Sequence, residues 1–248
     1  MKRFFITLSY NGKNYCGWQI QPNGVSVQET LQNALSTLLR KKIDVVGAGR
    51  TDSGVHARNM VAHFDLDKSI DPLSLTNKLN RFLPKDIVLH SIREVQPDAH
   101  ARFNALARTY TYCLTQQKDP FLHEYKHRIS FVPDIARMNS LCAILLETDD
   151  FTSFSKLHTD VKTNLCNVEY AQWEQDGCDY IFTIKANRFL RNMVRSIVGT
   201  LLLAGRGKLN EENFRAIIAA KNRAYAGESA PAHALFLEMV EYDASIWI

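Results

Sequence analysis

Residues 49–57 read Gly-Arg-Thr-Asp-Ser-Gly-Val-His-Ala and lie between two segments of strand composition, Val45-Val46 and 59–64. Glycines at 47, 49 and 54 permit turns and a close approach of the backbone to a ligand. If the run is extended, Arg50 and Asp52 project to the same side. Such a pair would keep the carboxylate ionised and lower its pKa, which suits a nucleophile better than a general acid. The same residues also fit a turn in which Asp52 caps backbone amides and Arg50 forms a surface ion pair.

The segments around this run predict an α+β half. Ser26 followed by Glu29 is the capping-box pattern of a helix start, and leucines at 31, 35, 38 and 39 recur at helical spacing. Asp71-Pro72 marks a second helix, which is expected to end near Pro84. Strands are expected over 4–10, 59–64 and 87–95. The order of strand, helix, strands, helix and strand predicts one antiparallel sheet.

The second half of the chain repeats this order loosely. Strands are expected over 108–115, 167–173, 180–185 and 235–242. Helices are expected over 134–147 and over 189–203, the latter with Gly205 as its C-cap, and a shorter helix follows the cap residue Asn210. We place the boundary near residue 105, so that residues 1–104 carry the Asp52 loop and residues 105–248 form the second α+β half.

Charge is unevenly distributed along the chain. The net charge is only +4, but residues 185–223 hold nine Lys or Arg and two acids. Residues 224–248 hold four acids and no Lys or Arg. A local basic surface fits a polyanionic partner such as nucleic acid, and it equally fits a solvated helix face.

Composition indicates an ordinary globular protein. Hydrophobic residues make up 46% and charged residues 23% of the 248 residues, and no apolar run approaches the 18 that a membrane helix needs. The N-terminus turns polar after six residues and lacks a cleavage site, so we expect a cytoplasmic protein. The five cysteines are scattered and form no Cys-x-x-Cys pair, which favours reduced thiols over a zinc site or disulfides.

The complete 49–57 run closely resembles the signature of the TruA-type tRNA pseudouridine synthases. Further segments resemble the family's motifs in the family's order, along nearly the whole chain. These segments are 15–19 with 26–29, 83–87, 100–103, 108–112, 150–154, 189–195 and 230–232. The resemblance implies the pseudouridine synthase fold, an α+β fold in which two ferredoxin-like halves share a central, mostly antiparallel sheet with helices packed on it.

The resemblance also implies an activity, which is the isomerisation of uridine to pseudouridine at positions 38, 39 and 40 of the tRNA anticodon stem-loop. No cofactor or metal is implied, and no membrane is involved. The target base must flip out of the stack to reach Asp52, the family's nucleophile, and this costs a few kcal/mol. Asp52 would attack either C1′ of the ribose or C6 of the base. The family further implies a homodimer that binds tRNA.

The other site residues follow from the same motifs. Tyr110 resembles the residue that stacks on the target uracil, and Tyr112 shares its strand face and could be an ordinary core tyrosine. Arg50 resembles the partner of the nucleophile, and Arg195 resembles an arginine that reaches the nucleophile from the long helix. Leu235 corresponds to the apolar lining of the uracil pocket.

Two arginines are expected to contact the substrate without a catalytic role. Arg58 follows the signature run directly. Arg191 stands where the family often has His, so we expect it to contact phosphate. Ala234 likewise replaces a frequent glycine before the pocket leucine, which could shift the local backbone.

Two other classes of protein are compatible with parts of the pattern. A noncatalytic RNA-binding module also pairs α+β halves with aromatic strands. A nucleoside hydrolase or glycosylase normally uses two carboxylates, and the signature loop holds no second Asp or Glu. A nucleotide-triphosphate enzyme is disfavoured, because Gly205-Arg206-Gly207-Lys208 lacks the phosphate-loop spacing.

Overall fold

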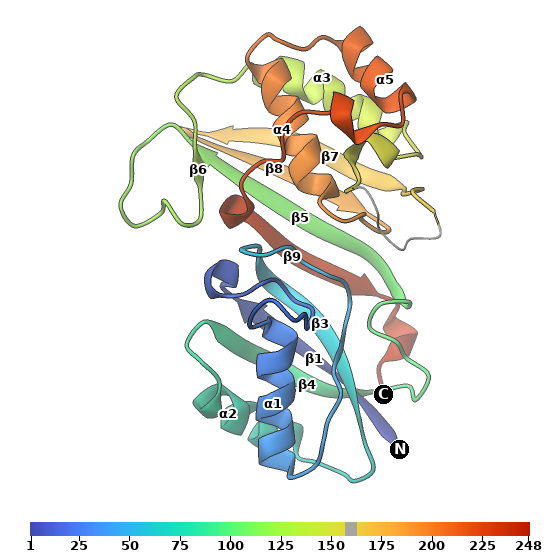
Figure 1. Ribbon diagram of the computed structural model, residues 1–248. Helices are drawn as coiled ribbons and strands as arrows, with labels where there is room; N and C mark the ends of the chain where they lie inside the picture. The colour runs from blue at the N-terminus through green and yellow to red at the C-terminus, as the bar shows by residue number, and fades with distance from the viewer. Residues whose placement is uncertain (157–162) are drawn as a thin grey trace. The chain divides into compact units, whose positions relative to one another are not determined.

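The computed structural model describes residues 1–156 and 163–248. The chain forms two compact units, which we call the first unit (Met1–Ala107 with Leu237–Ile248) and the second unit (Arg108–Phe236). Each unit combines antiparallel strands with α-helices that pack against them (Figure 1). The predicted α+β class is therefore confirmed.

The first unit is built on the strand order β4-β1-β3-β9. Strand β1 lies in the middle and pairs antiparallel with both β3 and β4. A short strand, β2, pairs with β3 immediately before the Asp52 loop. The bounds are β1 Lys2–Tyr10, β2 Val46–Gly47, β3 His56–Leu66, β4 Ile87–Val95 and β9 Leu235–Tyr242. All of the strands expected in this region are present.

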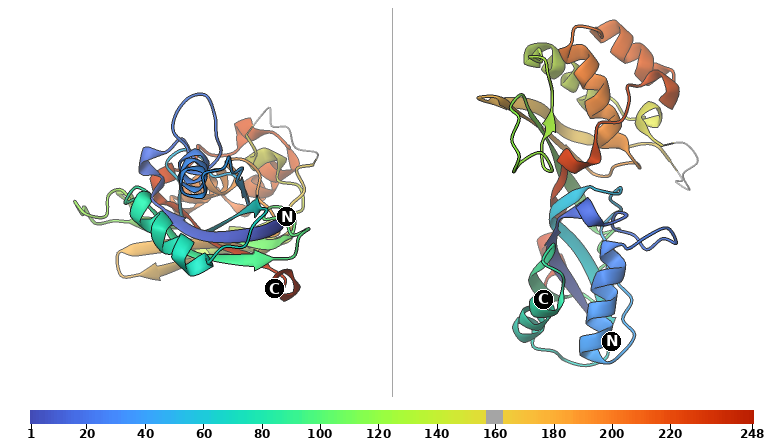
Figure 2. Two further views of the ribbon diagram at one scale, coloured as in Figure 1. Left: turned by 90° about the horizontal axis from the view of Figure 1, so that it is seen from below. Right: turned by 60° about the vertical axis from the view of Figure 1, so that its left-hand side comes forward.

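Helices α1 (Val27–Leu39) and α2 (Pro72–Phe82) begin where the sequence predicts them. The Ser26 Oγ accepts the Glu29 N–H at 3.2 Å, and the Asp71 carboxylate accepts two N–H groups of the first turn of α2. Helix α2 packs along β4 and contacts α1, and the two helices lie beside each other in both views of Figure 2. Leu31 and Leu35 of α1 are buried in the core.

The second unit has the strand order β5-β8-β7, with the short β6 parallel to β5. Helix α3 packs on β7 and contacts both α4 and α5. The strands are β5 Ala105–Thr115, β6 His127–Arg128, β7 Val168–Asp176 and β8 Asp179–Ala186. The helices are α3 Ile135–Leu146, α4 Met193–Gly205 and α5 Glu211–Ala219, and Asn210 caps α5 as predicted. Short 3₁₀ helices of the described residues are η1 Gly12–Asn14, η2 Thr152–Phe154, η3 Arg223–Tyr225, η4 Ala232–Ala234 and η5 Ala244–Ile246.

Two predictions about α4 are wrong. The helix begins at Met193, because Asn192 has φ 66°, a left-handed conformation that interrupts a helix starting at residue 189. Gly205 is the last helical residue and not the C-cap, which is Arg206 with φ −90°. A Cβ on Gly205 would lie 2.6 Å from the Met138 Sδ, so this glycine permits close packing between α4 and α3.

The grouping of the C-terminus differs from a simple division at residue 105. The Asn59 side chain on β3 donates to the Glu238 carbonyl at 2.9 Å, and the Tyr242 hydroxyl donates to the Ala101 carbonyl at 2.6 Å. The Arg93 guanidinium lies 4.2 Å from the centre of the Trp247 ring. These contacts tie Leu237–Ile248 to the first unit, although the segment follows the second unit in the chain.

All five cysteines fall within the described residues and carry free thiols, of which Cys142 and Cys166 are buried. No helix among the described residues is long and apolar enough to cross a membrane.

Candidate active site

The Asp52 loop connects β2 to β3 in the first unit. Asp52 is half-buried and Arg50 is exposed. The loop turns back on itself at Gly54, which has φ 79°, and the Val55 N–H donates to the Asp52 carbonyl at 3.2 Å. The prediction that glycine permits a turn in this run is confirmed for Gly54. The pairing of Arg50 with Asp52 stays a prediction.

A second segment of the first unit, residues 10–18, forms a cradle for this loop. The Tyr15 carbonyl accepts both the Ser53 hydroxyl at 3.2 Å and the Gly54 N–H at 3.3 Å. The Trp18 N–H donates to the Thr51 carbonyl at 3.3 Å. The loop is therefore held by backbone and side-chain hydrogen bonds from a segment more than thirty residues away in the chain.

A buried pair of hydroxyl groups also joins the cradle to the Asp52 loop. The Tyr10 hydroxyl and the Thr51 Oγ1 are 2.9 Å apart, and the two residues are 4% and 9% exposed. The Tyr10 ring lies near the Trp18 ring, with centroids 6.1 Å apart. This pair fixes the residue directly before Asp52.

Glycines make the close fit between cradle and loop possible. A Cβ on Gly12 would lie 2.0 Å from the Val55 carbonyl oxygen, and a Cβ on Gly17 would lie 2.2 Å from the Thr51 carbonyl oxygen. Gly17 also has φ 86°, which disfavours any L side chain. Sequence reasoning missed this cradle, although Gly12 and Gly17 among aromatic residues were a usable signal.

Gly47, which precedes the signature run, and Gly49 and Gly54 within it have different roles. A Cβ on Gly47 would lie 2.3 Å from the Trp18 Nε1, so this position accommodates the indole of the cradle. A Cβ on Gly49 would meet nothing within 4 Å. Of the three glycines, only Gly49 has no steric reason to lack a side chain.

Arg58, predicted to contact substrate, projects from β3 with an exposed side chain. Its Nε donates to the Glu238 Oε1 at 3.1 Å. The nearby His56 is buried, and its Nδ1 accepts the Gly12 N–H at 3.1 Å. His56 therefore supports the fold of the cradle.

The two tyrosines on one face of β5 have different surroundings. Tyr112 is fully buried, its hydroxyl donates to the Pro231 carbonyl at 3.0 Å, and burial raises its pKa. Tyr110 is half-buried and meets the edge of the Phe189 ring at a centroid distance of 5.1 Å and an angle of 85°. Tyr112 is therefore a core residue, and Tyr110 is only partly covered.

Arg195 and Leu235 are held through one loop of the second unit. The half-buried Arg195 donates from its Nε to the Ala230 carbonyl at 2.7 Å, and the Ala230 N–H donates to the Arg195 carbonyl at 2.9 Å. Leu235 is the first residue of β9, is 5% exposed and follows η4. The structure thus brings Arg195, Tyr112 and the segment leading to Leu235 together. Arg191 is exposed just before α4.

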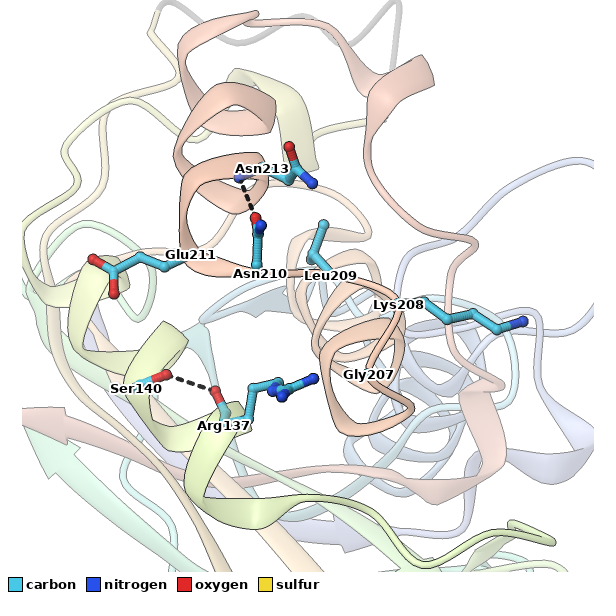
Figure 3. A pocket seen from close by; sticks show the side chains of 8 residues that line it. All are labelled: Arg137, Ser140, Gly207, Lys208, Leu209, Asn210, Glu211 and Asn213. Carbon is cyan, nitrogen blue, oxygen red and sulfur yellow. Dashed lines mark hydrogen bonds between the residues drawn. The ribbon is translucent and has the colours of Figure 1, made fainter.

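A separate hollow in the second unit contains none of the predicted site residues. It measures about 470 Å³ and lies where α3 and α5 begin (Figure 3). The Asn210 side chain accepts the Asn213 N–H at 2.8 Å, and the Ser140 hydroxyl donates to the Arg137 carbonyl at 2.9 Å. Its lining residues are Arg137, Ser140, Gly207, Lys208, Leu209, Asn210, Glu211 and Asn213. The Asn210 hydrogen bond caps α5 and the Ser140 hydrogen bond lies within α3, so both serve the helices that border the hollow.

Metal chemistry has no obvious location in the described part of the chain. Among residues 1–156 and 163–248, no group of three or more His, Cys, Asp or Glu side chains is arranged to hold a metal ion.

Comparison with known proteins assigns the family. The sequence model of a family described as "tRNA pseudouridine synthase" matches residues 6–104 and 142–243. The chain belongs to the tRNA pseudouridine synthase family. As a member of this family, it is an isomerase.

Full-length relatives agree with this assignment. A protein of Bacteroides thetaiotaomicron named tRNA pseudouridine synthase A is 56% identical over 100% of this chain and 93% of its own length. The protein of the same name from Parabacteroides distasonis is 56% identical over 98% of this chain and 96% of its own length. A more distant one, from Exiguobacterium sibiricum, is 36% identical over 99% of this chain and 98% of its own length.

Proposed function

We propose that this protein isomerises uridine to pseudouridine at positions 38, 39 and 40 of the tRNA anticodon stem-loop, with Asp52 as nucleophile and no cofactor. The relatives named tRNA pseudouridine synthase A support tRNA uridine isomerisation as the reaction. The observation that carries the role of Asp52 is the cradle, because Tyr10, Gly17 and Trp18 all act on the residue next to it.

A fixed loop suits a nucleophile. Intramolecular reactions gain about 7–11 kcal/mol when the reacting groups are held in a near-attack geometry. A loop that only turned the chain would not need two buried hydroxyls and a glycine with positive φ against its backbone. The cradle thus supports a chemical role for Asp52 over a capping role.

The reaction balances without an oxidant, a reductant or a second substrate. In one route the Asp52 carboxylate attacks C1′, the N1–C1′ bond breaks, and the uracil leaves with the electron pair. The base rotates, C5 bonds to C1′ and displaces the carboxylate, C5 loses its proton, and N1 gains one. In the other route the Asp52 carboxylate adds to C6 and the C5=C6 electron pair moves onto the C4 carbonyl. After the N1–C1′ bond breaks, the base rotates and C5 bonds to C1′, loss of the C5 proton expels the carboxylate from C6, and N1 gains a proton. Both routes are compatible with the half-buried Asp52.

Tyr110 is proposed to hold the flipped base. Stacking of a base on an aromatic ring contributes about 1–3 kcal/mol, which offsets part of the cost of flipping. Tyr110 is half-buried and Tyr112 is fully buried, which supports Tyr110 for this role. Its hydroxyl is also proposed to assist proton removal at C5.

The remaining parts of the proposal concern partners. Arg50 and Arg195 are proposed to orient Asp52, Leu235 to line the uracil pocket, and Arg58 and Arg191 to contact RNA. We further propose a homodimer that works on cytoplasmic tRNA, since a stem-loop is wide compared with one domain of this size.

The rival function is a noncatalytic RNA-binding module. Unmodified tRNA transcript is incubated with wild-type protein, digested to nucleosides and separated by chromatography, while binding is followed by filter retention. We expect pseudouridine to form, and we expect Asp52→Asn to bind tRNA normally without forming it. Normal binding by the wild type without any pseudouridine would establish the binding module instead.

A further inference from the structure

Arg223, the first residue of η3, carries a charge that has only neutral partners. Its Nη1 donates to the Ala226 carbonyl at 3.3 Å and its Nη2 to the Ser229 Oγ at 2.9 Å. The residue is half-buried, and burial lowers the pKa of its guanidinium. Among residues 1–156 and 163–248, no Asp or Glu forms an ion pair with it. The two neutral partners leave the positive charge of this half-buried side chain without a counter-charge in the described part of the chain.

Arg215 in the same unit shows the usual arrangement. Its guanidinium pairs with the Glu147 Oε2 at 3.3 Å and with the Glu211 Oε1 at 3.1 Å, although it is exposed. Arg223 is less exposed than Arg215 and has no such neutralisation within the described chain. A guanidinium has five N–H donors, so two hydrogen bonds leave three N–H groups available.

The surroundings of Arg223 are rich in donors. The Ser229 Oγ also accepts the Asn192 Nδ2–H at 2.6 Å, so an amide and a guanidinium converge on one hydroxyl. Asn192 has φ 66° and Lys221, which directly follows the C-cap of α5, has φ 46°.

The loop that holds Arg223, Ser229 and Asn192 together also contacts Arg195. Ser229 precedes Ala230, whose carbonyl accepts the Arg195 Nε–H at 2.7 Å. The loop also lies tight against α4, because a Cβ on Gly199 would be 1.7 Å from the Glu228 carbonyl oxygen. The Gly227 N–H donates to the Thr200 Oγ1 at 2.9 Å. An anion bound by Arg223 would therefore sit at a fixed place relative to Arg195.

We propose that Arg223, held by Ser229 and the Ala226 carbonyl, is a binding site for a phosphodiester group of the RNA substrate. The site rests on the proposed function, because that function makes the ligand an RNA backbone. The planar guanidinium fork matches two phosphate oxygens, and the N–H groups that make no hydrogen bond within the chain would supply the contacts. The bound phosphate supplies a negative charge next to Arg223. It also restrains the loop whose Ala230 carbonyl accepts the hydrogen bond from Arg195.

The salt dependence of tRNA binding tests this site directly. Each phosphate contact contributes about 0.7–0.9 to the slope of log K against log salt concentration. We expect Arg223→Gln to lower that slope by this amount and to weaken binding of unmodified tRNA transcript by about tenfold. Arg215→Gln is the matched control and should keep the wild-type slope, because Glu147 and Glu211 already neutralise its charge.

A scan of the RNA locates the phosphate. A methylphosphonate replaces one charged phosphate by a neutral group, and a set of stem-loop RNAs carries it at one position each. We expect the substitution at one position to weaken binding to the wild type and to have no further effect on binding to Arg223→Gln. An unchanged slope in Arg223→Gln would show that the residue only clamps the loop. A lost dimer with an unchanged slope would show that Arg223 pairs with a carboxylate of a second copy, and either result overturns the proposal.

Two controls separate a misfolded variant and a wrong proposed function from a wrong phosphate site. If the Arg223→Gln protein does not fold, Arg223→Lys replaces it in the test, because lysine keeps the positive charge and lacks the planar guanidinium. For Arg223→Lys we expect the wild-type salt dependence of tRNA binding and several-fold weaker binding. Wild-type binding by Arg223→Lys would contradict the site. Binding is measured without turnover, so a protein that binds through Arg223 and forms no pseudouridine refutes the proposed function and leaves the phosphate site standing.

Discussion

Replacement of Gly17 by Ala should inactivate the enzyme through the Asp52 loop while leaving the fold intact. The new Cβ would lie 2.2 Å from the Thr51 carbonyl oxygen, whereas real Cβ atoms keep at least 3.0 Å, so the gap must open by about 0.8 Å. A displacement of roughly 1 Å at a reacting group can cost about 100-fold in rate. The residue also has φ 86°, which adds about 1–2 kcal/mol of backbone strain for alanine.

The assay separates these two effects. Single-turnover rates and KM for an unmodified tRNA transcript are measured beside urea unfolding. We expect the rate to fall about 100-fold, KM to change little, and the free energy of unfolding to drop by about 1–3 kcal/mol.

Two glycines serve as matched controls. Gly177 has φ 59° and nothing within 4 Å of an added Cβ, so Gly177→Ala carries the backbone strain without the collision. Gly49 lies in the Asp52 loop with open space around it, so Gly49→Ala tests a methyl group in the loop alone. Both should keep the wild-type rate. A Gly17→Ala protein that loses stability like Gly177→Ala but turns over normally would refute the positioning role of the cradle.

Three further outcomes follow from the geometry. Tyr110→Phe should keep much of the tRNA binding and lose turnover, and unchanged turnover would remove its role in proton transfer. Tyr112→Phe should lower the free energy of unfolding by about 0.5–1.5 kcal/mol in a urea titration, because the hydrogen bond from the buried Tyr112 hydroxyl to the Pro231 carbonyl is lost. Burial lowers the pKa of His63 to about 4, and its Nδ1 accepts the Ala101 N–H, so the ring stays neutral in the folded protein above that pH. The unfolded chain takes up this proton below about pH 6.5, so the free energy of unfolding should fall by about 2 kcal/mol from pH 7.5 to pH 5, and His63→Gln should flatten that decline.

Local signals in the sequence were sufficient for most of the fold. Ser26, Asp71 and Asn210 cap helices through hydrogen bonds to residues two or three positions away, so their roles are readable from the sequence itself. The strand predicted over 87–95 has the same bounds as β4. Alternation and capping depend on neighbours in the chain, and these are visible without a structure.

Contacts between distant parts of the chain account for what the sequence did not predict. Helix α4 starts after the left-handed Asn192, whose side chain donates to the distant Ser229, and the glycine at 205 accommodates Met138 of another helix. Tyr110 and Tyr112 have the same strand phase, and only the placement of Pro231 shows which one is core. When a residue is buried by a segment that is distant in the sequence, the hydrophobic pattern around that residue does not show it.

The candidate site shows the same division. The signature run located Asp52, because a short motif carries its own chemistry. The cradle did not emerge from the sequence, since Tyr10 and Thr51 are forty-one positions apart and meet only once β1 is in place. Arg223 was likewise one of nine basic residues in a charged stretch, and its lack of an acidic partner is a property of the folded second unit.

The most direct test of the central claim maps the modified positions after reaction with wild-type and Asp52→Ala protein. Unmodified tRNA is treated with each protein, derivatised with carbodiimide and read by primer extension. The account predicts stops for pseudouridine at positions 38 to 40 with the wild type and none with Asp52→Ala. Uridine left intact at those positions by the wild type, or full activity of Asp52→Ala, would contradict it.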